Sequence, residues 1–338
     1  MKRLLLVIGI FALLSGGVWA QAPDLSEFEA SFQSFADGVA NSLPITASIG
    51  LNWSHAYIGQ FPHFGVGVSV GGMFLPYESI EPVVTALGVG SSIPEELKTL
   101  GLPFPTIAAG ARLGGFILPF DMGFKFGMIP EEAKDLFSED VTADFFLIGG
   151  DVRFPVVKGK GLIPTLSVGG GYTFLRGRIG ITDVSASQTI NLYDYLQPIY
   201  GGTTHELIFT EPDLTFNWDT HTIEAKAQAS WNLLLFTPHV GLGAAYGISN
   251  AGGGLSSTVV YSNDAGVTED QMKDVLESLG YPIPTANGLE VISEANGWSF
   301  WVYGGTAINI FFIKVDLSAM YNFLNGDYGA SINLRLQL

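Results

Sequence analysis

The chain has 338 residues with a formal net charge of -17, and 47% of its residues are hydrophobic while only 14% are charged. The absence of cysteine excludes disulfides, thiol chemistry and a lipid-modified N-terminal cysteine, and the negative charge disfavours nucleic acid as a partner. After the N-terminal apolar stretch, no apolar run reaches the length of about eighteen residues that a membrane helix needs.

The N-terminus has the pattern of a secretory signal peptide. Lys2 and Arg3 form a basic start, an apolar stretch follows from Leu4 to Leu14, and Val18-Trp19-Ala20 precede a cleavage position before Gln21. The apolar stretch is too short for a membrane anchor. We therefore expect residues 1–20 to be a signal peptide.

Residues 21–43 are expected to form a helical, plug-like segment. Within them an amphipathic helix is predicted over Asp24 to Ser42, because apolar residues recur at three- and four-residue spacing: Leu25, Phe28, Phe32, Phe35 and Val39. Such a mostly aromatic stripe must be buried. In a barrel protein it can fill the lumen, pack under the periplasmic mouth or lie on the membrane surface. We favour the lumen, because a lumen lined by Gly, Ser and Asn leaves room for a helix.

From residue 44 to residue 338 the chain shows the two-residue alternation of β-strands. Apolar residues occupy every second position in Tyr328–Leu338 and Phe120–Met128, and the alternation in Thr220–Leu235 is longer than a usual soluble strand. The other expected strands are Ile45–Trp53, Phe64–Phe74, Thr106–Leu118, Val141–Phe154, Leu166–Phe174, Val240–Ile248, Trp298–Phe312 and Ile313–Phe323. A soluble sheet with one buried face also alternates in this way.

Charged residues in these strands avoid the apolar face, which favours a membrane barrel over a soluble sheet. A lysine or arginine that faces lipid near the midplane costs about 2–4 kcal/mol, whereas one that faces a wet lumen costs little. We expect the following residues to line the lumen: Arg112, Lys125, Glu224, Lys226, Lys314, Asp316, Asn333 and Arg335. There they either set the ion preference of an open pore or pair across strands and lock a closed barrel.

The connections between strands differ in length. Those near residues 119, 237 and 312 are tight, whereas residues 76–103, 181–219 and 250–297 form long connections that contain short predicted helices and many acidic residues. Outer-membrane barrels pair short periplasmic turns with long outer loops in this way. The acidic residues indicate solvated loop surface, and no segment matches a calcium-binding loop.

The predicted fold is therefore an all-β, antiparallel transmembrane β-barrel of about twelve strands, with ten or fourteen as alternatives. Because such barrels have an even number of strands, either Thr203–Phe216 or the segment after Ile181 adds a strand to the eleven named above, or the first of the eleven lies outside the wall. The N-terminal helix precedes the barrel, which spans residues 44–338, and short helices lie in the long outer loops. The expected location is the outer membrane, whose lipid is a partner. We expect no cofactor and no metal ion.

An enzymatic activity is not expected. The five histidines, His55, His63, His205, His221 and His239, are scattered, and neither H-E-x-x-H nor G-x-S-x-G occurs. A catalytic triad is recognised by geometry, so sequence spacing alone does not exclude one.

The order of parts, with a signal, a plug-like segment, strands with long helical outer loops and a C-terminal strand, resembles bacterial outer-membrane barrels of the long-chain fatty-acid transporter type and related spirochaete barrels of unassigned function. That transporter type carries Asn-Pro-Ala near its mature N-terminus, where this chain has Asn41-Ser42-Leu43-Pro44, and ends in Phe, where this chain has Leu338. The resemblance implies a channel that the N-terminal segment partly closes.

We therefore expect a channel or transporter for small, hydrophobic or amphipathic molecules, with Trp298 and Trp301 as aromatic residues at the outer mouth. Two alternatives stay open. A closed structural or adhesive barrel would act through its acidic outer loops, and a secreted soluble β-protein would not enter a membrane. The sequence identifies neither the ligand nor the oligomeric state.

Overall fold

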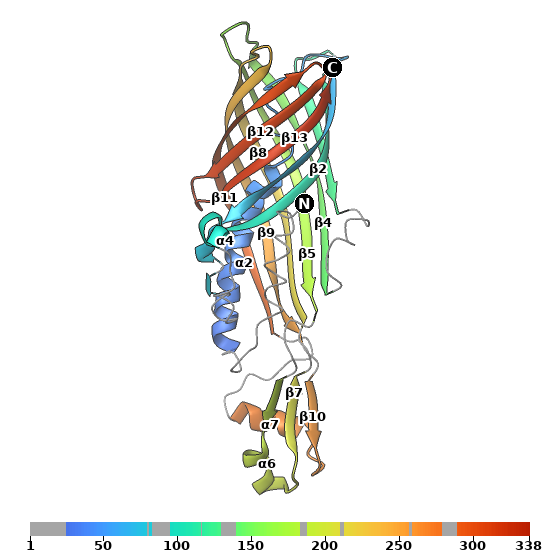
Figure 1. Ribbon diagram of the computed structural model, residues 1–338, viewed down its shortest axis with the longest axis vertical. Coiled ribbons are helices and arrows are strands. Elements are labelled where there is room, and N and C mark those ends of the chain that lie inside the picture. The colour runs from blue at the N-terminus through green and yellow to red at the C-terminus, as the bar shows by residue number, and fades with distance from the viewer. Residues whose placement is uncertain are drawn as a thin grey trace.

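The computed structural model describes residues 25–79, 81–82, 95–115, 117–129, 140–182, 188–209, 213–256, 259–278 and 289–338. The predicted signal peptide lies outside these ranges. Within them, ten antiparallel strands form a closed barrel in the order β1-β13-β12-β11-β9-β8-β5-β4-β3-β2 (Figure 1). The barrel closes where β1 pairs with β13, from Gly65 opposite Gln337 to Phe74 opposite Tyr328.

The barrel strands are β1 (Phe64–Leu75), β2 (Leu102–Gly114), β3 (Asp121–Met128), β4 (Val141–Val157), β5 (Thr165–Ile181), β8 (Asp213–Ser230), β9 (Phe236–Ser256), β11 (Leu289–Ile310), β12 (Ile313–Asn322) and β13 (Tyr328–Gln337). The prediction of an all-β antiparallel barrel is confirmed. The expected number of about twelve strands is wrong, because the described strands of the barrel number ten. Two segments account for the difference, and both lie outside the wall.

The first is the connection after β5, which forms part of a separate sheet. Strands β6 (Gln188–Asn191), β7 (His205–Phe209) and β10 (Val259–Asn263) make this three-stranded sheet. Helices α6 (Tyr193–Tyr200) and α7 (Glu269–Ser278) accompany it, and the buried core comprises Leu192, Leu196, Val267 and Met272. We call these five elements the outer module. Figure 1 shows it at the far end of the molecule from the C-terminus.

The second is the predicted strand Ile45–Trp53, which is not a strand. Helix α2 (Leu25–Ser48) continues through Pro44, and the chain from residue 49 to residue 63, here called the threaded segment, runs without regular structure to β1. Residues 42–54 are all buried. Since protein surrounds them on every side, their alternation of apolar and polar residues does not separate a lipid face from a wet face.

The two ends of the barrel differ as the sequence predicts. The short connections β2–β3, β4–β5, β8–β9 and β11–β12 lie at the same end as the C-terminus, which we call the turn end. The three long connections lie at the opposite end, the loop end, together with the outer module, helix α4 (Glu95–Leu100) and the turn η1 (Tyr77–Ser79). Strands β8, β9 and β11 are longer than β12 and β13, so one side of the wall continues beyond the other at the loop end.

Helix α2 packs against the inner face of this extended wall, on β8, β9 and β11. Its side chains Phe32, Phe35 and Val39 are buried, whereas Ser34 and Asn41 on its opposite side are exposed. The close approach depends on glycine, because a Cβ atom at Gly247 would lie 2.2 Å from Pro44. The helix therefore begins at the loop end and ends inside the barrel.

The outer surface of the wall is apolar. Val66, Val68 and Val70 of β1 are 45–53% exposed, as are many similar residues on the other strands. Aromatic side chains gather at the edges of this band: Phe64, Phe154, Phe236, Phe311 and Phe312 near the turn end, and Phe74, Tyr246, Trp298, Phe300 and Tyr328 toward the loop end. An apolar band between two aromatic levels is typical of a barrel wall in lipid.

Among the helices in the described ranges, none combines the length and the apolar character that crossing a membrane requires.

Candidate functional site

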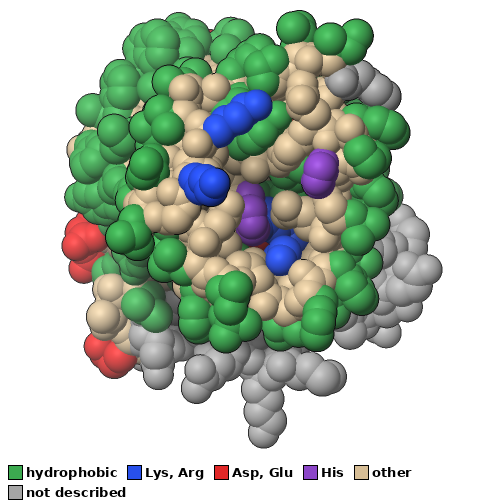
Figure 2. Space-filling view, turned by 90° about the horizontal axis from the view of Figure 1, so that it is seen from above, with side chains coloured by type: hydrophobic (Ala, Val, Ile, Leu, Met, Phe, Trp, Pro, Cys, Tyr) green, Lys and Arg blue, Asp and Glu red, His purple; other side chains and the backbone are tan. Residues whose placement is uncertain are grey.

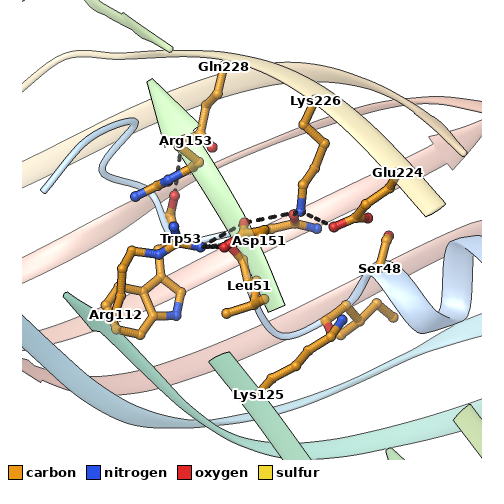
Figure 3. A network of polar contacts seen from close by, with 12 residues as sticks. Ser48, Leu51, Trp53, Arg112, Lys125, Asp151, Arg153, Glu224, Lys226 and Gln228 are labelled. Carbon is orange, nitrogen blue, oxygen red and sulfur yellow. Dashed lines mark hydrogen bonds and ion pairs between the residues drawn. The ribbon is translucent and has the colours of Figure 1, made fainter. Parts of the chain in front are cut away.

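The half of the lumen near the turn end contains a network of buried charges. Arg112 of β2 contacts two carboxylates, with Nη1 2.5 Å from Asp121 Oδ1 and Nη2 2.7 Å from Asp151 Oδ1. Arg153 of β4 pairs with the other oxygen of Asp121 at 2.9 Å. Figure 3 shows Arg112, Asp151 and Arg153 of this network converging from neighbouring strands. The pairs link β2, β3 and β4 inside the barrel.

The network continues onto β8. Lys226 Nζ lies 2.8 Å from Glu224 Oε1 and 4.0 Å from Asp151 Oδ2. None of the paired side chains is more than 6% exposed, so all are withdrawn from bulk water. The charges balance, with three cations and three carboxylates: Arg112, Arg153, Lys226, Asp121, Asp151 and Glu224. Such balance is needed because an unpaired buried charge is strongly destabilising.

The side chains of the wall supply hydrogen bonds to the backbone of the threaded segment. Gln228 Nε2 donates to the carbonyl oxygens of Trp53 and Ser54 at 2.8 and 3.0 Å. Arg153 Nη1 donates to His55 O at 2.8 Å, and Asp121 accepts from Ile58 N at 2.7 Å. A buried backbone without regular structure needs such partners. The charged lumen therefore holds an irregular chain in place.

Lys125 of β3 holds the end of helix α2. Its ammonium donates to Ala47 O and to Ile49 O, the latter at 2.9 Å. The Ala47 carbonyl belongs to the last turn of the helix, where the backbone lacks its own donors and where a cation is favourable, and the Ile49 carbonyl belongs to the first residue of the threaded segment. Lys125 thus joins the barrel wall to the point where the helix passes into the threaded segment (Figure 3).

Trp53 lies between two arginines in the middle of the lumen. The guanidinium of Arg335 lies 4.7 Å from the centre of the Trp53 ring, and that of Arg112 lies 5.7 Å from it. Arg335 Nη2 also donates to Ser54 Oγ at 2.9 Å, and Arg335 Nε lies 3.1 Å from Asp316 Oδ2. Arg335 belongs to β13 and Arg112 belongs to β2, and β1 lies between these two strands in the barrel. Trp53 therefore contacts the wall on both sides of β1, where the barrel closes.

The side of the lumen formed by β9, β12 and β13 is less completely paired. Among the described residues, both ring nitrogens of His239, the side-chain amide of Asn333 and the hydroxyl of Ser318 have no hydrogen-bond partner although they are buried. Seen from the turn end, Lys, Arg and His side chains lie within a ring of hydrophobic side chains (Figure 2). This side of the lumen therefore keeps buried polar groups without hydrogen-bond partners.

The half of the lumen toward the loop end has the opposite character. Phe216 of β8 packs against Phe32 and Phe35 of α2 with ring centroids 5.8 and 4.9 Å apart. Phe104 and Trp218 make a further edge contact at 4.7 Å. The lumen is therefore aromatic toward the loop end and charged toward the turn end.

Most of the residues that the sequence assigns to the lumen point inward. Arg112, Lys125, Glu224, Lys226, Asp316, Asn333 and Arg335 are buried, and Lys314 is half-buried at the turn end, where it donates to Phe311 O at 3.0 Å. Of the predicted helix stripe, Phe32, Phe35 and Val39 are buried, and the side chains of Leu25 and Phe28 lie outside the described set.

The placement of Trp298 and Trp301 together at the outer mouth is wrong. Trp298 lies on the outer surface, 58% exposed, and packs against Tyr246. Trp301 is fully buried inside the barrel in a cluster with Ile45 and Ile49. It fits over Gly243, where a Cβ atom would lie 2.2 Å from its ring. The odd spacing of the two tryptophans places them on opposite faces of β11.

Five residues of the site were not predicted from the sequence: Asp121, Asp151, Arg153, Trp53 and Gln228. Strand β4 gives the reason, because Leu147, Asp151 and Arg153 all point inward and are buried. The inward face changes from apolar beside α2 to charged beside the threaded segment. One signal in the sequence could have identified the carboxylates among them. Lysines and arginines that are buried in a lumen require carboxylates nearby to balance their charge.

Within the described residues, no group of three or more His, Asp and Glu side chains is placed to hold a metal ion.

No protein-family model matches the chain, and no curated protein matches it. Among solved structures, the translocator domain of autotransporter NalP from Neisseria meningitidis is 10% identical and has a TM-score of 0.35, covering 93% of this chain and 99% of its own. A Pseudomonas aeruginosa FadL homologue is 9% identical with a TM-score of 0.26, covering 90% and 97%. The Ralstonia pickettii toluene transporter TbuX is 8% identical with a TM-score of 0.25, covering 87% and 92%.

Proposed function

We propose that the protein is an outer-membrane channel for small hydrophobic or amphipathic molecules and that its own N-terminal segment closes it. The observation that carries this proposal is the occupation of the lumen by residues 42–58, which are held by polar side chains of the wall. We therefore extend the proposed plug from residues 21–43 to residue 58.

The contacts of the threaded segment favour a reversible closure. They include hydrogen bonds to side chains such as Gln228, Arg153 and Asp316, which water can replace when the segment moves. Six wall charges that face the segment also pair among themselves: Arg112, Asp121, Asp151, Arg153, Glu224 and Lys226. These ion pairs do not depend on the segment. A barrel closed by a purely apolar core would lose much more stabilisation free energy on opening, because its apolar surface would become exposed to water.

The two halves of the lumen support an amphipathic substrate. The aromatic half around Phe216 and Trp218 fits an apolar chain or ring, and the half around Arg112 and Lys226 fits a polar group. Pockets that bind small molecules combine apolar walls with a few placed polar groups in the same way. A molecule with one apolar and one polar end would match both halves.

The test uses the absence of cysteine from the chain. Ser42 Oγ donates to Asp327 Oδ2 at 2.6 Å, so the pair Ser42→Cys and Asp327→Cys is placed to link α2 to the turn after β12. In planar bilayers the reduced double variant should conduct and the oxidised one should not. The two single variants control for loss of the native hydrogen bond, because their conductance should not depend on the reductant.

A deletion gives a second measurement. Removing residues 24–42 should raise single-channel conductance and should allow an amphipathic fluorescent dye to enter liposomes. Unchanged conductance in both the deletion and the reduced double variant would contradict the proposal. Dye entry that is no faster than entry of a sugar of similar size would contradict the substrate class.

A closed adhesive barrel is a second candidate, favoured by the outer module. This module has its own core and carries the acidic residues Asp194, Glu206, Asp264, Asp270 and Asp274. Its position beyond the barrel suits contact with another surface (Figure 1). If this candidate is correct, replacing residues 188–209 and 259–278 with short linkers will abolish binding to host-cell or matrix surfaces, and no plug variant will conduct.

A further inference from the structure

His55 of the threaded segment is bound by side chains from two strands of the wall. Arg335 Nη2 of β13 lies 2.8 Å from the ring nitrogen His55 Nδ1, and Arg153 Nη1 of β4 donates to His55 O at 2.8 Å. The neighbouring residue is held in the same place. Ser54 Oγ accepts from Arg335 Nη2 at 2.9 Å, and Ser54 N donates to Asp316 Oδ1 at 3.0 Å. Residues 54 and 55 are therefore a point where the threaded segment is attached to β4, β12 and β13.

The contact between His55 and Arg335 fixes the protonation state of the ring. A guanidinium has only N–H donors and no acceptor, and it keeps its charge in proteins. His55 Nδ1 must therefore accept the hydrogen bond with its lone pair. The ring is thus neutral and carries its hydrogen on Nε2. A ring with hydrogens on both nitrogens cannot form this contact.

The surroundings of the ring oppose a positive charge on it. Four basic side chains act on it electrostatically: Arg335, Lys314, Arg153 and His239. The carboxylates next to these arginines are already engaged, because Asp316 Oδ2 lies 3.1 Å from Arg335 Nε and Asp121 Oδ2 lies 2.9 Å from Arg153 Nη2. A proton on His55 would therefore add a like charge to a basic cluster whose counter-charges are paired.

We propose that His55 is a pH-sensitive latch, whose protonation releases the threaded segment and opens the lumen. This inference rests on the proposed function, because it names what regulates the same closure. A proton from solvent binds Nδ1, the hydrogen bond with Arg335 is lost, and the imidazolium is repelled by the adjacent guanidinium. Residues 42–54 are buried, whereas His55 is only half-buried. A proton can therefore reach the ring while the lumen is closed.

The sign and the size of the effect follow from proton linkage. In the open state the ring is in water and takes up a proton as a free histidine does, at about pH 6.5. In the closed state the contact with Arg335 excludes this proton. Acid therefore favours the open state, and the opening equilibrium should rise about tenfold between pH 7.5 and pH 5.5.

The test compares the full native chain with two variants at these two pH values. Planar bilayers give the open probability, and amide exchange gives the protection factors of residues 49–58. In the native protein, acid should raise the open probability and lower the protection factors about tenfold. In His55→Asn, whose side-chain oxygen accepts from Arg335 but takes up no proton, neither quantity should change. His55→Lys places a permanent charge beside Arg335 and should be open at both pH values.

His63→Asn is the matched control, because His63 lies in the same segment but is exposed, with its ring bonded to Gln60 O. It should keep the full response to acid. An equal response in the native protein and in His55→Asn, or a response that disappears in His239→Asn, would overturn the latch. If acid lowers protection in the native protein but not in His55→Asn, and no variant conducts, the latch stands and the proposed channel fails. Heat-modifiable migration on a detergent gel checks that each variant folds.

Discussion

The guanidinium of Arg335, three residues before the end of the chain, lies 4.7 Å from the centre of the Trp53 ring. The last strand of the barrel therefore contacts the segment that enters the lumen before the first strand. Because Arg335 also donates to Ser54, closure of the wall and closure of the lumen depend on the same side chain.

Trp53→Ala should open the lumen. The ring is 2% exposed and contacts two arginines, so its removal leaves a cavity and two guanidinium groups without their aromatic contact. We expect the free energy of unfolding to fall by about 3–5 kcal/mol and single-channel conductance to rise. Chemical denaturation in detergent and planar-bilayer recording measure the two effects.

Trp298→Ala is the matched control for this substitution. Trp298 lies on the outer surface, packs against Tyr246 and does not face the lumen. Its removal should leave conductance at the native value. An equal rise in conductance in the two variants would show that Trp53 does not close the lumen.

Lys125→Met should release the end of helix α2. The substitution keeps the length of the side chain but removes the ammonium that donates to Ala47 O and Ile49 O. Hydrogen bonds from charged donors contribute about 1.5–3 kcal/mol, so we expect a loss of about 2 kcal/mol in the free energy of unfolding. Amide hydrogen exchange of residues 42–54 should become faster. Lys314→Met removes a lysine whose ammonium donates to Phe311 O in the β11–β12 turn and not to the helix end, and it should leave that exchange unchanged.

The start of helix α2 should be accessible from the side of the long loops. The helix begins at the loop end, and the chain then passes through the lumen toward the turn end before β1 begins. An epitope inserted immediately before Leu25 should bind antibody on intact cells. The same epitope inserted at Gly161, in the β4–β5 turn, should bind only after the outer membrane is permeabilised. The reverse pattern would contradict the orientation that short periplasmic turns imply.

The outer module should lose a stabilising contact in acid. Hydrogen bonds from the Thr203 hydroxyl and from the backbone amides of Thr203 and Thr204 lower the pKa of Asp264 to about 2. Because the folded pKa lies below the value of about 3.9 in an unfolded chain, this contribution to stability is present above pH 4 and is lost as the pH falls toward 2.

NMR amide shifts of Thr203 and Thr204 in detergent micelles measure this titration directly. They should move with a midpoint near the pKa of about 2. Asp264→Asn removes the titrating group and should abolish the movement. A midpoint at the ordinary value for an aspartate would show that these hydrogen bonds do not form.

The sequence by itself determined the wall of the barrel. One face of each strand contacts lipid and the other faces the lumen, so apolar and polar residues must alternate along the strand. This alternation can be seen directly in segments such as Phe120–Met128 and Tyr328–Leu338. The start of helix α7 is also set locally, by two residues three positions apart. Thr268 N donates to Gln271 Oε1 at 2.9 Å, and Gln271 N donates back to Thr268 Oγ1 at 3.4 Å.

Only the tertiary structure decided what fills the barrel. Residues 45–53 alternate like a wall strand, but they lie inside the lumen, where polar residues on both sides find partners in the wall, so alternation carries no information about their position. The contacts that hold them, such as Ser54 N with Asp316 Oδ1, join residues 262 positions apart. Pairings over such distances follow from the closure of the whole barrel, which no local pattern of residues specifies.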